Sequence, residues 1–157
     1  MTHLQQLAMP FPAKFVKDPP QGKHGQYVPH HVIGQRALEV VGPHSFQVTE
    51  PIRGYAGIIK GKDHTWPARD GAIVGCLATL TVTVDGHMVS VTEVGTEDQP
   101  AMNHDAENLK RAASDAYKRC WMRLGLGLHL WAQGDYFLSS NLGDNDGAVV
   151  VVVGEDT

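Results

Sequence analysis

The spacing of apolar residues along the chain predicts one helix followed by three strands. Apolar residues recur at helical spacing from Tyr27 to Val41, so a three-turn helix is expected to begin near Pro29. Gly42-Pro43 should end it, because glycine caps a helix and proline cannot continue one. Strands are expected at Ser45 to Ile52, Ala72 to Val84 and His87 to Val94, where apolar side chains alternate with polar ones.

A tight turn and a longer helix complete the pattern. Asp85-Gly86 joins the last two strands and is a strong signal for an antiparallel hairpin. A helix capped by Asn103 or Asp105 should run to Leu124 and close at Gly125. Its apolar face comprises Leu109, Ala112, Ala113, Ala116, Tyr117, Cys120 and Leu124. A shorter helix is expected at 128–133. These elements predict an α+β fold with an antiparallel three-stranded β-β-β-α core flanked by an N-terminal helix.

Three segments lie outside this core. Residues 1–26 are rich in proline and glycine and should form a short helix or turn and an extended arm on the core, or else a flexible terminus. Residues 53–70 are expected to be a loop. The domain should therefore span 27–138, followed by a tail over 139–157. The valines from Val149 to Val153 should add an edge strand to their own sheet or to a neighbouring subunit, because an exposed run would aggregate; a disordered tail is the alternative.

Length and composition indicate one globular domain. The chain has 157 residues, 42% of them hydrophobic. No apolar run approaches the ~20 residues of a membrane helix and the start lacks a signal-peptide pattern, so a cytoplasmic protein without membrane contact is expected. Cys76 and Cys120 are expected to be reduced core residues. The net charge of −4 argues against a nucleic-acid partner, but a total does not describe how charge is distributed.

The sequence contains few signs of catalysis. His30-His31 is the only adjacent pair among the nine histidines, and neighbours on a helix point about 100° apart, which hinders binding of one metal. The metal motifs H-E-x-x-H and paired C-x-x-C are lacking. The glycines at 125 and 127 follow a helix rather than a strand, which favours a helix break over a phosphate loop. We therefore expect no catalytic residue, metal or cofactor; a small hydrolase using buried His and Asp residues is a remote alternative.

The expected long helix concentrates positive charge. Five of the 13 Lys and Arg residues lie on it: Lys110, Arg111, Lys118, Arg119 and Arg123. With Trp121 beside Lys118, this combination suits single-stranded nucleic acid, because cations follow the phosphates and an aromatic ring can stack on a base. Basic residues near a helix C-terminus are also favoured by the helix dipole, and composition alone favours that ordinary interpretation. Asp115, four residues from both Arg111 and Arg119, is expected to orient the two.

Several segments between Gly22 and Leu138, about three quarters of the chain, resemble the DNA-annealing domain of the Rad52 family. They are Gly22-Lys23 to Tyr27-Val28, the Val32–Gly42 helix followed by Phe46, the Asp85-Gly86 hairpin with Glu93-Val94-Gly95, Asp135 to Leu138 and, most specific, Lys110 to Cys120 ending in Leu124-Gly125. The resemblance implies subunits packed in a closed ring of around eleven, with single-stranded DNA in a basic groove. It further implies ATP-independent strand annealing in homologous recombination and double-strand break repair. A single-strand binding protein is a possible partner, and the short length suggests a bacterial or phage relative.

The resemblance also suggests which residues contact DNA. The family's groove lysine–arginine pair falls on Lys118 and Arg119. A further family arginine falls on Met122, so Arg123 is expected to serve instead. The expected DNA-binding residues are Lys118, Arg119, Arg123, Arg111, Lys110 and Arg36.

Other family positions are not matched. The groove arginine and tyrosine around the first helix fall on Val32 and Pro43, which leaves Arg36 as the nearest substitute. The lysine of a second DNA site falls on Val84, which puts that site in doubt. Two alternatives stay open: a module that coats single-stranded DNA or RNA without annealing it, and a structural ring without a nucleic-acid role.

Overall fold

The computed structural model describes residues 1–22, 24–54, 58–60, 65–67, 71–98, 100 and 104–144. The helices are α1 (His3–Ala8), α2 (His30–Val41), α3 (Asp105–Met122), α4 (Leu128–Ala132) and α5 (Leu138–Asp144), with short 3-10 turns at Ala13–Phe15 and Gln133–Asp135. The strands are β1 (Ser45–Gly54), β2 (Ile58–Lys60), β3 (Thr65–Pro67), β4 (Ala72–Val84) and β5 (His87–Thr96). The predicted valine strand of the tail lies outside the described residues.

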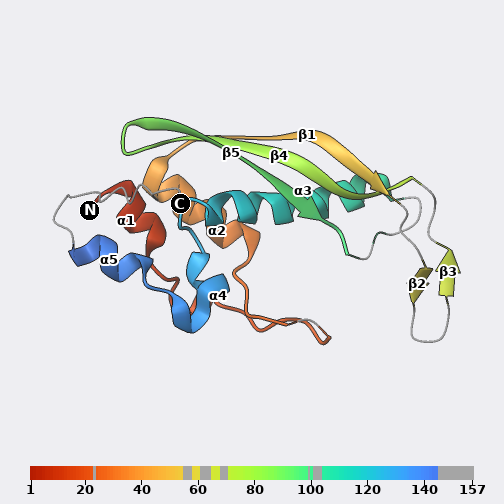
Figure 1. Ribbon diagram of the computed structural model, residues 1–157, viewed down its shortest axis with the longest axis horizontal. Helices are drawn as coiled ribbons and strands as arrows, with labels where there is room; N and C mark the ends of the chain where they lie inside the picture. The colour runs from red at the N-terminus through yellow and green to blue at the C-terminus, as the bar shows by residue number, and fades with distance from the viewer. Residues whose placement is uncertain are drawn as a thin grey trace, which may run out of the picture.

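The main sheet is antiparallel, in the order β1-β4-β5, and α3 runs beneath it (Figure 1). The predicted α+β fold is confirmed. β4 has the predicted bounds, whereas β1 and β5 each run two residues beyond the predicted ends, Ile52 and Val94. The prediction of a loop over 53–70 was wrong, because β2 and β3 pair there as a separate two-stranded sheet. Its Ile-Ile and Thr-Trp segments have β propensity, whereas the glycines and lysines around them are typical of a loop.

The β4–β5 turn has the predicted form and holds the N-terminus. Asp85 and Gly86 have φ values of 48° and 80°, the left-handed pair that a two-residue hairpin turn requires. The Asp85 carboxylate accepts hydrogen bonds from the backbone N–H groups of His3 (2.7 Å) and Leu4 (3.2 Å) at the start of α1. The hairpin therefore caps a helix more than eighty residues away in sequence.

The face of α3 that meets the sheet consists of small residues. Ala112, Ala116 and Cys120 are fully buried, and Gly95 of β5 lies directly against the helix backbone. His104 occupies the N-cap position of α3, so the capping prediction was wrong for Asp105, which is the first residue of the helix and pairs with Arg53 at 3.3 Å. The other predicted cap, Asn103, lies outside the described residues. Both cysteines are buried and free, as predicted.

The N-terminal segment packs on the core. Leu7, Ala8 and Phe11 are buried, and an isolated bridge joins Lys17 to Tyr27. This agrees with the predicted short helix and arm. Of the helices in the described part of the chain, none has the length and apolar character that a membrane crossing needs.

Candidate nucleic-acid interface

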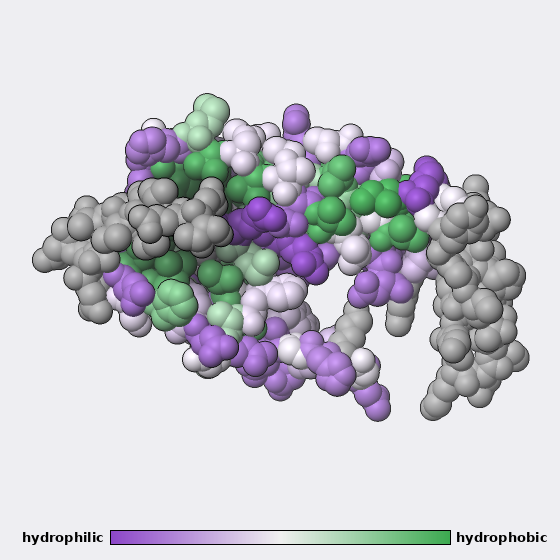
Figure 2. All heavy atoms as spheres, in the orientation of Figure 1, coloured by the Kyte–Doolittle hydropathy of each residue, from purple (hydrophilic) through white to green (hydrophobic). Residues whose placement is uncertain are grey.

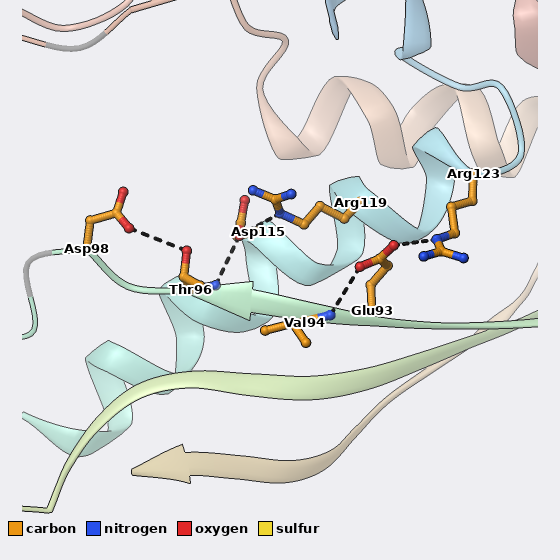
Figure 3. Close-up of polar contacts among 7 residues, drawn as sticks. All are labelled: Glu93, Val94, Thr96, Asp98, Asp115, Arg119 and Arg123. Atoms are coloured by element: carbon orange, nitrogen blue, oxygen red, sulfur yellow. Dashed lines mark hydrogen bonds and ion pairs between the residues drawn. The ribbon is translucent and has the colours of Figure 1, made fainter. Parts of the chain in front are cut away.

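Two of the predicted arginines leave α3 on the side that faces β5 (Figure 3). Arg119 donates from Nε to Asp115 Oδ2 at 3.0 Å, and that oxygen also accepts the backbone N–H of Thr96 at 3.0 Å. One turn later Arg123 pairs with Glu93 of β5. The Asp115–Arg119 contact on which the predicted orienting role depends is therefore present, and Asp115 also ties α3 to the end of β5.

The other α3 cations lie nearer its N-terminal end. Arg111 pairs with Glu97 at 3.7 Å, so the prediction that Asp115 orients it was wrong: the end of β5 brings a second carboxylate closer. Lys110 pairs with Glu107 one turn earlier, at 3.5 Å and largely in solvent. Exposed pairs of this kind contribute about 0–1 kcal/mol, so an incoming anion can replace them.

Lys118 differs from the other predicted cations. Its side chain is half-buried and its Nζ lies 5.5 Å from the centre of the Tyr27 ring. Burial lowers the pKa of Lys118, and the charge of Asp115 partly offsets this. Within the described residues it is the one predicted cation without a carboxylate or carbonyl partner. An anion placed here would give the ammonium a directly bonded partner in addition to the charge of Asp115.

Arg36 of α2 is occupied by the fold. Its guanidinium donates to the Met9 carbonyl at 2.6 Å and lies 4.0 Å from the centre of the Phe11 ring. These contacts hold the N-terminal segment on α2. Arg36, the expected substitute for the family's groove arginine, therefore differs from the cations of α3, because its contacts are with the N-terminal segment.

The prediction that Trp121 stacks on a base was wrong. Trp121 is fully buried and packs edge-on against His44, 5.0 Å away between ring centres. Trp131 of α4 is exposed instead: it is 59% exposed and has the Arg119 guanidinium 5.1 Å from its ring centre. A five-residue helix is too short to show an apolar face in the sequence, so its tryptophan carried no signal.

Three of the six predicted cations line two adjoining hollows, whereas Lys110, Arg123 and Arg36 border neither. A polar cavity of about 400 Å³ is bordered by the cations Arg111, Lys118 and Arg119 and by the carboxylates of Glu97, Asp98 and Asp115. A second cavity of about 340 Å³ shares Lys118 and Asp115 with it and continues past Tyr27 to Trp131. Figure 2 shows hydrophilic residues gathered in the middle of this face, where α3 runs beneath β5. The two hollows form a groove that is polar and charged at one end and aromatic at the other.

Two of the described histidines, His30 and His44, have partners within the fold. His30 hydrogen-bonds Ser114 at 2.8 Å and stacks on Tyr117 at 4.5 Å, while His44 meets the Tyr117 hydroxyl at 3.0 Å. Burial, then the charges of Lys118 and His31, lowers the pKa of His30. No group of three metal-binding side chains occurs among the residues that the structure describes.

An α+β domain whose long helix places cations along a groove has features that are typical of proteins that bind an extended polyanion. The family described as "Rad52/22 family double-strand break repair protein" matches residues 2–148. The chain therefore belongs to the Rad52/22 family, whose role is DNA double-strand break repair and recombination. The match reaches beyond the segments from Gly22 to Leu138 in both directions and includes the N-terminal segment. No curated protein matches the sequence.

Proposed function

We propose that this chain binds single-stranded DNA in the groove along α3 and promotes annealing of complementary strands, without bond-making chemistry or a nucleotide cofactor. One observation carries the proposal. Lys118 and Arg119, the residues that match the family's groove pair, border the same cavity beside Arg111. The carboxylates of Glu97, Asp98 and Asp115 border the same cavity, and two of them pair with Arg111 and Arg119. We expect the closely spaced phosphates of a single strand to take the place of these paired carboxylates.

The ion pairs decide how the phosphates would be held. Arg119 and Arg111 are already positioned by Asp115 and Glu97, so little side-chain freedom is lost when a phosphate replaces the carboxylate. Lys118 exchanges no carboxylate and gains a directly bonded partner. We therefore expect Lys118 and Arg119 to contribute most of the affinity.

Annealing then follows from the way in which the strand is presented. A strand held by its phosphates keeps most base edges free to test pairing with a second strand. Assembly into a closed ring, which the family resemblance implies, would extend the groove from one subunit to the next. A ring would also supply many weak contacts at once, which raises overall affinity without a tight individual site.

The first experiment measures how DNA affinity depends on salt. Replacing both Lys118 and Arg119 by alanine should reduce the slope of log K against log salt by roughly one to two units, since each phosphate contact to a single strand contributes ~0.7. The control is Lys14→Ala/Arg53→Ala, which removes the same two residue types from exposed positions on other elements. It should leave the slope unchanged. A folded Lys118→Ala/Arg119→Ala protein with wild-type affinity and slope would contradict the proposal.

The second experiment separates annealing from coating. Complementary oligonucleotides carrying a fluorescence donor and acceptor should anneal faster with the protein than without it, in the absence of ATP. Binding that leaves the annealing rate unchanged, or lowers it, would favour a coating module. The variant Lys118→Arg/Arg119→Lys retains both charges and should keep most of the salt slope. It shows whether the reduced slope of the alanine variant comes from lost charge or from a change in the fold.

A further inference from the structure

The second cavity has two aromatic walls that phosphate binding does not require. Tyr27 and Trp131 both line it, and they are 38% and 59% exposed. Each ring has a cation next to it: Lys118 lies 5.5 Å from the Tyr27 centre, and Arg119 lies 5.1 Å from the Trp131 centre. The same two cations that match the family's groove pair therefore each contact an exposed ring.

The lining of the cavity suits a flat, partly polar group. Its apolar floor includes Val28, Ile33 and Leu126, which are buried. Its rim includes the amide side chains of Gln26 and Gln133, which can donate and accept hydrogen bonds. The volume of about 340 Å³ is within the range of small-ligand sites.

We propose that this cavity takes one nucleobase of the bound strand, stacked on Trp131 and Tyr27, while the adjoining phosphate lies at Lys118 and Arg119. The proposal rests on the proposed function and adds a base contact to it. Stacking on an aromatic ring tolerates any base, because every base has a π face. Since the cavity holds one base, each chain would anchor the strand at one nucleotide and leave the neighbouring bases free to pair.

The test combines a protein change with a DNA change. Oligodeoxythymidine is compared with an abasic oligonucleotide of the same length, which has the same phosphates and no bases. The wild-type chain should bind oligodeoxythymidine at least about fivefold more tightly, the lower end of what one stacked base provides. Trp131→Ala should remove most of that preference, and Trp131→Phe should keep most of it. Phe137→Ala is the matched control, because Phe137 is a 66% exposed aromatic residue outside the cavity lining.

The comparison separates stacking from an indirect effect through Arg119. If Trp131 only positions Arg119, Trp131→Ala will weaken binding to both oligonucleotides by the same factor, and the base-binding proposal is overturned. It is also overturned if Trp131→Ala keeps the wild-type preference. If the wild-type chain binds neither oligonucleotide, single-strand binding itself fails. Binding to both with equal affinity refutes the base contact alone.

Discussion

The contact between β5 and α3 can be tested at Gly95. A Cβ atom at this position would overlap the carbonyl oxygen of Ala112, and would lie 2.7 Å from the amide nitrogen and 2.8 Å from the Cβ of Ala116. These obstacles are the backbone of α3 and a Cβ fixed to it, so no side chain can rotate away. The Gly95→Ala substitution must therefore push the helix and the strand apart.

The expected loss of stability follows from that geometry. Overpacking a core typically costs 1–3 kcal/mol, and a rigid backbone obstacle places Gly95→Ala at the upper end, about 3 kcal/mol. For a domain of this size 1 kcal/mol lowers the melting temperature by about 2–4 °C, so the shift should be about 6–12 °C. The same separation would pull Glu93 and Thr96 of β5 away from Arg123 and Asp115 on α3.

A thermal melt followed by circular dichroism measures this effect. Gly134→Ala is the control, because nothing lies within 4 Å of its added Cβ, and its melting temperature should stay the same or rise slightly. If Gly95→Ala and Gly134→Ala melt at the same temperature, the close approach of β5 and α3 is wrong. Because the separation would disturb the ion pairs between β5 and α3, Gly95→Ala should also bind DNA more weakly. A destabilised Gly95→Ala protein with wild-type DNA affinity would contradict this expectation.

Two further predictions concern the N-terminal half of the fold. Asp85→Asn keeps a residue that tolerates a left-handed turn but removes the charge that caps α1, so the free energy of unfolding should fall by about 0.5–1 kcal/mol in a denaturant titration; no change would mean that the cap is not formed in solution. Burial, and then the charge of Arg36, lowers the pKa of His129 below its usual value of about 6.5, and His129 Nε2 accepts the backbone N–H of Phe11. The unfolded chain therefore binds more protons below pH 6.5, and the free energy of unfolding should fall as pH is lowered from about 7 to about 5. His129→Gln should make that slope shallower, and an unchanged slope would assign the effect to other groups.

Much of the fold could be predicted because it depends on local signals. Period-two alternation defined β4 to the residue, and Asp85-Gly86 identified the turn, since few residue pairs tolerate two left-handed positions. The strand extensions and the β2–β3 pairing were missed. Both depend on which partner strand lies opposite, and a single sequence does not contain that information.

The site was predicted less completely, and for a physical reason. Helical spacing shows that Lys118 and Arg119 share one helix, but ion pairs with residues from β5 and the burial of Trp121 are set by tertiary packing. Trp131 was missed because the short α4 has no periodicity of its own, and it reaches the groove only after the chain has reversed beyond α3. The family resemblance selected Lys118 and Arg119 as predicted DNA contacts, whereas the aromatic end of the groove required the structure.

The pairing of the cations also reconciles an acidic chain with a polyanionic ligand. Arg111, Arg119 and Arg123 each have a carboxylate partner, and partly exposed pairs of this kind contribute only about 0–1 kcal/mol, so a phosphate can displace the carboxylate at a small cost in free energy. Each contact to a strand is then weak and reversible, and the net charge of −4 is no obstacle to binding. In the proposed function this is an advantage, because an annealing protein has to hold a strand long enough to test pairing and then release the duplex. A groove of uncompensated cations would bind the strand more tightly and release the duplex more slowly.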